Sequence, residues 1–140
     1  MNNLYYTNEL PDIDDFFALY ESTGWNDNSK RPKELLFNAL KNSWYFLSVY
    51  ADGRFVGCGR IISDGCLHAF ITEMIISSEY QMKGIGKEIL KRLVGKALKS
   101  GIKDIQLFCA KGKEEFYLKN GFEKRPDDAP GMQYIIGKNI

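Results

Sequence analysis

The residues most able to do chemistry meet in a glycine-containing turn, Gln81-Met82-Lys83-Gly84-Ile85-Gly86-Lys87. This turn lies between a strand expected to end near Ile76 and an amphipathic helix expected over 84–100. The N-terminus of a helix presents free N–H groups and the positive end of its dipole, so it can bind an anion. Gly84 and Gly86 place no Cβ between the backbone and a phosphate. The spacing indicates a phosphate site, with a tight turn that binds nothing as the alternative.

The turn differs from two familiar nucleotide-binding motifs. The pattern GxxxxGK[ST] needs an earlier glycine ahead of the Gly84–Gly86 pair, and GxGxxG needs a glycine where Ile89 stands. Both motifs also come with repeated strand–helix–strand units, whereas the sequence ahead of this turn predicts an antiparallel meander. We therefore expect neither a P-loop nor a Rossmann domain.

A carboxylate precedes the turn on the same expected strand. By a period of two, Glu73 shares a strand face with Leu67, Ala69, Ile71 and Ile75. A carboxylate among apolar neighbours is costly unless it is paired or functional. Burial of this kind would make Glu73 a usable general base near neutral pH. The alternative is a carboxylate at a strand end that reaches solvent. We expect His68, on the same strand, to be a hydrogen-bonded strand histidine, and it is also a minor candidate for the base.

The surrounding pattern predicts an α+β fold with a mixed sheet. Asp52-Gly53 and Asp64-Gly65 predict hairpin turns between segments rich in aromatic and β-branched residues. The order strand, helix, strand around 84–100 implies a parallel pair with a right-handed crossover. Strands are expected over 4–7, 44–50, 54–62, 67–76 and 103–109, at Phe122 and over 132–136. Helices are expected from Pro11 to Gly24, and over 32–40, 84–100 and 114–120.

Composition bounds what the chain can be. Its 140 residues fit a single domain over 1–140, and a hydrophobic content of 44% is enough for a real core. A net charge of +1 gives no field that would steer nucleic acid or an anionic membrane to the protein. Three cysteines and one histidine argue against a disulfide framework and a metal site. With no signal peptide and no membrane-spanning run, we expect a cytoplasmic protein without a metal.

Two motifs in this order resemble the GNAT superfamily of acetyl-CoA-dependent N-acetyltransferases. Gln81, Gly84 and Gly86 match its Q/R-x-x-G-x-G/A signature, and the segment FYLKNGF at 116–122 is similar to its F-Y-x-x-x-G-F segment. The element order agrees over nearly the whole chain, whereas the N-terminal half matches only in pattern. The resemblance implies a mixed, mostly antiparallel sheet of about six to seven strands with a parallel splayed pair and about four flanking helices.

The resemblance also implies a role for each part of these motifs. Acetyl-CoA would be the co-substrate, with its pyrophosphate on backbone N–H groups of the glycine turn and its pantetheine arm paired with the end of the preceding strand. A bulge in that strand would aim an N–H at the thioester carbonyl. Tyr117 matches the tyrosine that protonates the leaving thiolate, with a core aromatic residue as the alternative. The implied cofactor-binding residues are Met74, Ile75, Ile76, Gln81, Met82, Lys83, Gly84, Ile85, Gly86, Lys87, Cys109, Phe116, Tyr117 and Lys119.

Cys109 departs from the family pattern, which more often has an asparagine near this place. A covalent acetyl-cysteine is conceivable there, but we expect a small buried residue that fills space at the end of a strand. We expect Lys111, Lys113 and Lys119 to be solvated side chains, with contact to the 3′-phosphate of coenzyme A as the alternative.

The implied function is transfer of an acetyl group from acetyl-CoA to a primary amine of a small molecule. The amine would attack directly, with Glu73 as base and Tyr117 as acid. Acetylation of a protein lysine or N-terminus is the alternative enzyme, and a non-catalytic acyl-CoA-binding regulator or a structural domain are alternatives of other classes. The expected partners are coenzyme A and a small-molecule amine, with no nucleic acid and no membrane, in a monomer or homodimer.

Overall fold

The computed structural model describes residues 3–137. The chain divides into two compact units, the first ending at Phe108 and the second beginning at Cys109. The strands of the described chain all lie in the first unit, together with the three longer helices. The second unit contains one short helix. The α+β fold expected from the sequence is confirmed.

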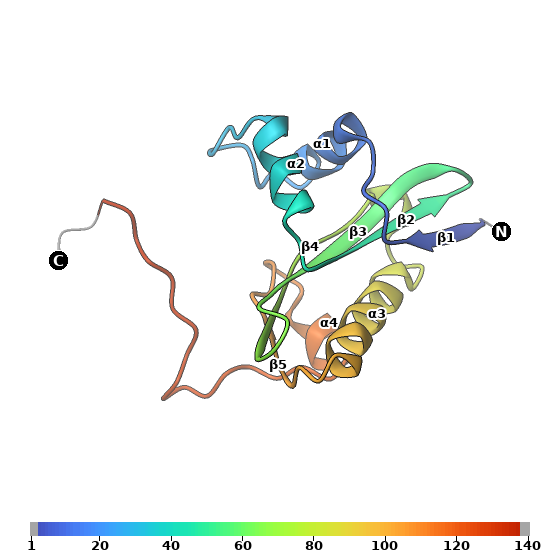
Figure 1. Cartoon of the computed structure of the whole chain (residues 1–140). Coiled ribbons are helices and arrows are strands. Elements are labelled where there is room, and N and C mark those ends of the chain that lie inside the picture. Colours follow the sequence, from blue (N-terminus) through green and yellow to red (C-terminus); the bar gives the residue numbers. More distant parts are fainter. Residues whose placement is uncertain (1–2, 138–140) are drawn as a thin grey trace. The chain divides into compact units, whose positions relative to one another are not determined.

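The first unit is built on a five-stranded sheet in the order β1-β2-β3-β4-β5 (Figure 1). Neighbouring strands are antiparallel except for β4 and β5, which are parallel. The expected meander and the expected parallel pair are therefore both present. The strands are β1 (Leu4–Thr7), β2 (Tyr45–Ala51), β3 (Arg54–Ser63), β4 (His68–Ile76) and β5 (Asp104–Leu107).

Helices cover both faces of this sheet. α1 (Ile13–Glu21) and α2 (Lys33–Lys41) lie on one face, and α3 (Ile85–Lys99) lies on the other (Figure 1). The start of α1 is fixed by Asp12, whose carboxylate accepts hydrogen bonds from the backbone N–H groups of Asp14 and Asp15. A short 3₁₀ helix, η1 (Ser78–Tyr80), connects β4 to the glycine turn. The two helix layers thus enclose β3 and β4.

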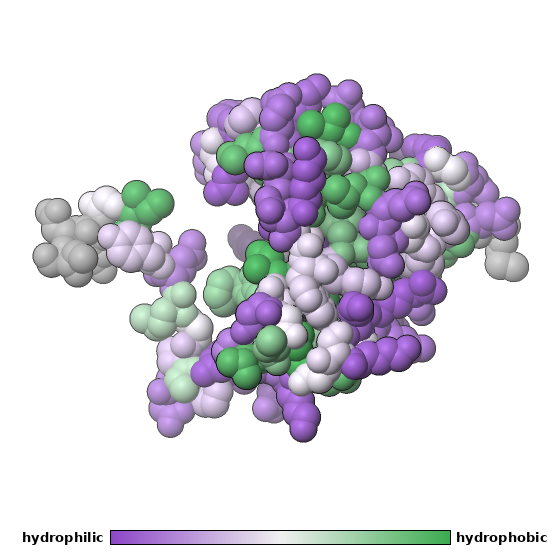
Figure 2. Space-filling view, in the orientation of Figure 1, coloured by the Kyte–Doolittle hydropathy of each residue, from purple (hydrophilic) through white to green (hydrophobic). Residues whose placement is uncertain are grey.

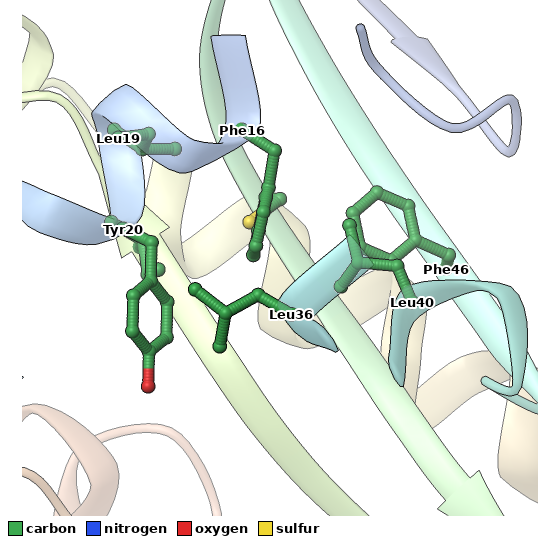
Figure 3. Close-up of a cluster of buried hydrophobic side chains, with 8 residues drawn as sticks. Phe16, Leu19, Tyr20, Leu36, Leu40 and Phe46 are labelled. Carbon is green, nitrogen blue, oxygen red and sulfur yellow. The ribbon is translucent and has the colours of Figure 1, made fainter. Parts of the chain in front are cut away.

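The core between the sheet and the α1–α2 layer is aromatic and aliphatic. In Figure 3 the labelled side chains converge from α1, α2 and β2. Helical spacing brings one stripe of each helix inward, while the outer surface of this layer is mostly hydrophilic (Figure 2). Burial of this stripe against β3 and β4 fixes the position of α2 above the strands. The buried members are Phe16, Leu19, Tyr20, Leu36, Leu40, Phe46, Cys58 and Ile75.

The second unit is organised around α4 (Glu114–Leu118). The ring of Tyr117 makes edge-on contacts with the rings of Phe116 and Phe122, at centroid distances of 5.1 and 5.9 Å. An exposed ion pair of 3.0 Å joins Lys124 to Glu114. The FYLKNGF segment therefore folds back on itself around the tyrosine.

The expected strands at Phe122 and over 132–136 are wrong. In residues 109–137 no strand forms, so the described sheet has five strands instead of six or seven. A strand needs a neighbouring segment to pair its N–H and C=O groups, and an alternating pattern supplies no such partner by itself. The side chains of Met132, Tyr134 and Ile136 are accordingly exposed.

Candidate active site

A β-bulge in β4 sets the geometry of the site. Arg60 pairs with Thr72, and Cys58 pairs with Ile75, so Glu73 and the residue after it together oppose one glycine of β3. Glu73 has a φ of 48°, in the left-handed region that costs a non-glycine residue about 1–2 kcal/mol. A strained residue of this kind is held by its surroundings, and such positions gather at functional sites.

The bulge changes the face on which Glu73 lies. Thr72 pairs with Arg60, which contacts α2, so this pair faces the α1–α2 layer. Ile71 is one residue earlier and faces α3. The extra residue of the bulge returns Glu73 to the α1–α2 face, where Ile75 also lies in the aromatic core. The prediction that Glu73 shares a face with Ala69 and Ile71 is therefore wrong, and the prediction for Ile75 holds.

The Glu73 carboxylate is paired. Its Oε1 atom lies 2.6 Å from Nε of Arg60, and its Oε2 atom accepts a hydrogen bond of 3.1 Å from Oγ1 of Thr72. The side chains of Arg60 and Glu73 are 11% and 21% exposed, so this is a partly buried ion pair. The guanidinium stabilises the negative charge that apolar neighbours alone would oppose. Glu73 thus remains a candidate base, in surroundings more polar than its sequence neighbours indicated.

Arg60 is in turn fixed to the α1–α2 layer. Its NH1 group donates to the backbone carbonyl of Ala39 at 3.0 Å and to Oγ of Ser43 at 3.3 Å. One side chain therefore joins the end of α2 to the bulge of β4. Cys58 lies next to this pair, and its thiol donates to the Glu73 carbonyl at 3.4 Å. Burial, and then the charge of Glu73, raise the pKa of this thiol, so it stays protonated and is no nucleophile.

On the other face of the sheet, Gly59 lets α3 approach the bulge. A Cβ at this position would lie 2.8 Å from Cγ2 of Ile89 and 2.9 Å from Cδ1 of Leu93. Both atoms belong to fully buried side chains of α3, so a methyl group there would push the helix outward. The close approach holds the start of α3 at a fixed height relative to β4.

The strands β4 and β5 separate at the bulge. Their parallel pairing runs from His68 to Ile71 on β4 and stops there, because β5 ends at Leu107. On its other side β4 stays paired with β3 as far as Ile76. The expected splayed pair is thus present, and the expected pantetheine segment Met74, Ile75 and Ile76 lies in the stretch of β4 beyond the β5 pairing.

The glycine turn follows directly. The side chain of Gln81 donates to the Ile76 carbonyl at 2.9 Å, which closes the turn against the end of β4. Met82 and Gly84 both have positive φ, 63° and 83°, and α3 begins at Ile85. Backbone N–H groups at such a turn and in the first helical turn point away from the helix and can bind an anion. All the turn's expected cofactor residues are gathered here.

The charges of this turn are exposed. The side chains of Lys83 and Lys87 are exposed, and the Lys83 ammonium lies 5.4 Å from the centre of the Tyr80 ring. Gly84 is the residue before the helix, and no side chain caps the helix N-terminus there. The unused capping position and the two lysines suit a phosphate group.

A hollow of about 410 Å³ lies on the same sheet face as Glu73, toward the N-terminal end of β4. Its two carboxylates have internal partners. Asp64 accepts three backbone N–H bonds, which lower its pKa to about 2, and Asp104 lies 2.7 Å from Nδ1 of His68. His68 is therefore a paired, exposed residue at the rim. The lining residues are Ile62, Ser63, Asp64, His68, Ala69, Phe70, Asp104 and Gln106.

Tyr117 lies in the second unit. Burial raises the pKa of its hydroxyl above the ordinary value, and the charge of a Cys109 thiolate adds to the rise. The hydroxyl is therefore held in its protonated form, as an acid requires. Cys109 lies outside β5 and is exposed, so the expectation of a buried residue at a strand end is wrong. Phe116 packs on Tyr117, and Lys119 is exposed.

The order of these features, a bulged strand, a divergent parallel partner and a glycine turn feeding a helix, can be compared with known families. Residues 10–122 match the model of the Acetyltransferase (GNAT) family. The chain belongs to the GNAT family of acetyltransferases.

Relatives of this GNAT chain are found in plants and red algae. It is 32% identical over 132 residues to a soybean protein named histone acetyltransferase TAP1, covering 86% of this chain and 56% of the relative. It is 35% identical over 118 residues to the uncharacterized N-acetyltransferase ycf52 of Pyropia yezoensis, covering 81% and 66%. The GNAT chain thus spans about half to two thirds of the length of these relatives.

Solved structures share the fold. A GNAT family protein of Streptococcus pneumoniae TIGR4 superposes with a TM-score of 0.80 and 26% identity, over 99% of this chain and all of the other. The PaiA N-acetyltransferase of Thermoplasma acidophilum, solved in complex with coenzyme A, gives a TM-score of 0.72 at 22% identity, over 88% of this chain and 91% of the other. The second likeness bears on the fold alone.

Sequence reasoning missed two residues of the candidate site. Arg60 is a cation inside an otherwise apolar strand, one strand away from a carboxylate, and that pairing of opposite charges was the available signal. Gly59 is a glycine inside an expected strand, which is a signal of a bulge or a close approach of another segment. The approach is to α3, and the bulge lies on the partner strand β4.

In residues 3–137, no group of three or more histidine, cysteine, aspartate or glutamate side chains could hold a metal ion. No helix in this part of the chain has the length and apolar character needed to cross a bilayer.

Proposed function

We propose that this GNAT chain is an acetyl-CoA-dependent N-acetyltransferase that acts on a primary amine of a small molecule in the cytoplasm. Both units would contribute to one catalytic domain over 1–140. The observation that carries the proposal is the run from the Glu73 bulge to the glycine turn. Within one short stretch, β4 parts from β5 and leads to a helix N-terminus, which suits an extended thioester ending in phosphates.

Coenzyme A would bind along this run. Its pyrophosphate would accept hydrogen bonds from the N–H groups between Lys83 and Gly86, with the Lys87 ammonium nearby. Its pantetheine arm would add as an extra strand to the stretch of β4 beyond the β5 pairing. A bound coenzyme A in the PaiA relative's structure accords with this assignment. Gln81 would act indirectly, by holding the turn against Ile76.

The chemistry would divide between two side chains. Glu73, as a carboxylate, would accept the proton of the attacking amine, directly or through a water, while the amine nitrogen bonds to the thioester carbon. A backbone N–H at the bulge would stabilise the oxyanion. Collapse would break the carbon–sulfur bond, and the Tyr117 hydroxyl would give its proton to the thiolate. The products are an N-acetylated amine and coenzyme A.

The hollow near the N-terminal end of β4 supports a small apolar amine over a polyamine. Its carboxylates are engaged by backbone N–H groups and by His68, whereas Ile62 and Phe70 offer apolar surface. The ring of Phe108 lies 5.0 Å from that of Phe70 and extends this surface along the strands. A rice relative, 29% identical over 109 residues, is named for serotonin, an aromatic amine.

Acetylation of protein lysine is the second candidate. The observation in its favour is the 32% identity to the soybean protein named for histone acetylation. A lysine side chain could reach the same bulge, since its amine also stands at the end of an apolar stem.

The test is release of free thiol from acetyl-CoA by the purified chain. Tryptamine, spermidine and a lysine-containing peptide would be compared at equal concentration, with acetyl-CoA alone as control. We expect release with tryptamine above the control, and the mass of its N-acetyl product. Release with the peptide alone would favour the second candidate. Binding of coenzyme A without release for any amine would favour a regulator.

A further inference from the structure

Arg60 is an unusual residue for its position. It lies in the middle of β3 between Gly59 and Ile61, with a side chain only 11% exposed. A buried cation is costly unless it is paired and hydrogen-bonded. Arg60 meets this requirement with a carboxylate, a backbone carbonyl and a hydroxyl. Such a complete set of partners fixes the guanidinium in one orientation.

The partners come from two layers. The Nε group of Arg60 donates to the Glu73 carboxylate on β4, while its NH1 group donates to the Ala39 carbonyl and the Ser43 hydroxyl at the end of α2. The guanidinium is planar, so fixing one edge against α2 fixes the direction in which the other edge presents its proton to Glu73. The cation also lies where the negative end of the α2 dipole favours it.

In residues 3–137, Arg60 is the charged side chain that forms an ion pair with Glu73. From β3, the neighbouring Cys58 stays a neutral thiol because burial raises its pKa. From β4, Thr72 donates a neutral hydroxyl. The Ala39 carbonyl and the Ser43 hydroxyl at the end of α2 are neutral and contact Arg60, and from α1 the buried Tyr20 joins the core that includes Cys58. The carboxylate form of Glu73 is therefore stabilised chiefly by the guanidinium.

We propose that Arg60 is a positioning residue for acetyl transfer, which holds Glu73 ionised and aimed from the strained bulge. The inference rests on the proposed function, in which Glu73 accepts the proton of the amine. A carboxylate has about four acceptor positions, so the bonds from Arg60 and Thr72 leave room for an amine or a water. The end of α2 thereby becomes part of the catalytic support.

Removal of the Arg60 guanidinium should shift the pH–rate profile in one direction. The base must be a carboxylate, and the Arg60 guanidinium 2.6 Å away interacts favourably with that charged form. Removing the guanidinium leaves a partly buried carboxyl that takes up its proton more easily, so the acid limb of the rate profile moves to higher pH. An opposite charge at this distance typically accounts for about one to three pH units. A role confined to stability would lower the melting temperature and leave the limb in place.

The experiment compares Arg60→Met with the unmodified protein. Methionine keeps an unbranched apolar stem and removes the charge. We expect an acid limb displaced upward by about one pH unit or more, with little change in coenzyme A affinity. Glu73→Gln is the matched control. Because the effect of Arg60 would act through Glu73, adding Arg60→Met to Glu73→Gln should displace the acid limb no further. An unmoved limb in folded Arg60→Met would overturn the proposal.

A second measurement needs no acceptor. Carboxyl-¹³C glutamate labelling, with Glu73→Gln to assign the signal, follows Glu73 directly. We expect its signal to titrate at higher pH in Arg60→Met than in the unmodified protein, and an equal titration would overturn the proposal. If Arg60→Met fails to fold, Arg60→Lys and Ser43→Ala replace it, with a smaller displacement expected in the same direction and none as the contrary result. If no amine is acetylated, the proposed function fails, but this titration still tests whether Arg60 acts on Glu73.

Discussion

The Glu73 bulge and the Tyr117 ring cluster differ in the electrostatic surroundings that they provide. Glu73 is surrounded by donors, with a guanidinium at 2.6 Å and a hydroxyl at 3.1 Å, which together favour a negative charge. Tyr117 is surrounded by aromatic rings, and its burial raises the pKa of the hydroxyl. A base must be free of its proton and an acid must keep it. The difference between the two surroundings matches these two requirements, and it can be tested from both sides.

The largest expected effect comes from removing the cofactor that both regions would serve. Gly86→Asp should abolish coenzyme A binding, because a carboxylate would stand where the pyrophosphate rests. The fold should survive, since aspartate is favoured in the first turn of a helix. Calorimetric titration measures this. Gly86→Ala adds a Cβ without the charge and should lose less affinity. Unchanged affinity in folded Gly86→Asp would place the phosphates elsewhere.

The next effect separates the base from the acid. Glu73→Gln should lower the rate by about 10²–10⁴-fold at neutral pH, because the amide cannot accept the proton. The loss should shrink at high pH, where the amine is already neutral. The measurement is a pH–rate profile under saturating acetyl-CoA. A profile equal to that of the unmodified protein would assign the base to His68 or to a water.

A smaller effect is expected in the ring cluster. Tyr117→Phe keeps the ring and its contacts, so unfolding free energy should change by only about 1 kcal/mol. Single-turnover transfer should slow by about 10²-fold, at the low end for acid catalysis, because a thiolate is a tolerable leaving group.

The pH profile of the unmodified protein checks the same residue. Its raised pKa keeps the Tyr117 hydroxyl protonated beyond the range of an ordinary tyrosine, so any alkaline loss that depends on it should begin above that range. A folded, binding-competent Tyr117→Phe with an unchanged single-turnover rate would reduce Tyr117 to a packing residue.

The smallest catalytic effect should come from the far face of the sheet. Gly59→Ala introduces a methyl group 2.8 Å from Ile89, an overpacking that typically costs about 1–3 kcal/mol. The charges at Glu73 and the rings at Tyr117 are untouched, so the rate per folded molecule should change little. Chemical denaturation measures the stability, with Gly95→Ala, where nothing lies within 4 Å, as the control. Equal stability of the two variants would show that α3 adjusts freely.

Local patterns predicted much of the first unit. The dipeptides Asp52-Gly53 and Asp64-Gly65 lie at the two hairpins of the meander, and the spacing of apolar residues over 84–100 matches α3 (Ile85–Lys99). The glycine turn was likewise recognisable. Gly84 has a positive φ, and because such backbone positions favour glycine, the residue type itself marks the turn in the sequence. These features depend on neighbours a few residues apart in the chain, which is why the sequence contains them.

The features that failed depend on distant partners. The expected strands at Phe122 and over 132–136 needed a segment to pair with, and the pattern of one segment does not provide another. The side of the sheet on which Glu73 lies depends on the extra residue of the bulge in β4. That residue shifts the alternation of side chains between the two faces, so counting every second residue along the sequence gave the wrong face. Cys109 was expected to be buried because β5 was expected to reach it, and β5 ends at Leu107.

The sequence by itself determined the order of the elements, the phosphate-binding character of the glycine turn and the family of the chain, because these reside in short spacings and residue types. Only the tertiary structure decided that Glu73 is paired with Arg60, that α2 anchors that pair, and that Gly59 admits α3 beside the bulge. The physical reason is range. Burial, charge pairing and close packing are set by residues that meet in space, and Arg60 and Ala39 meet although 21 positions separate them in the chain.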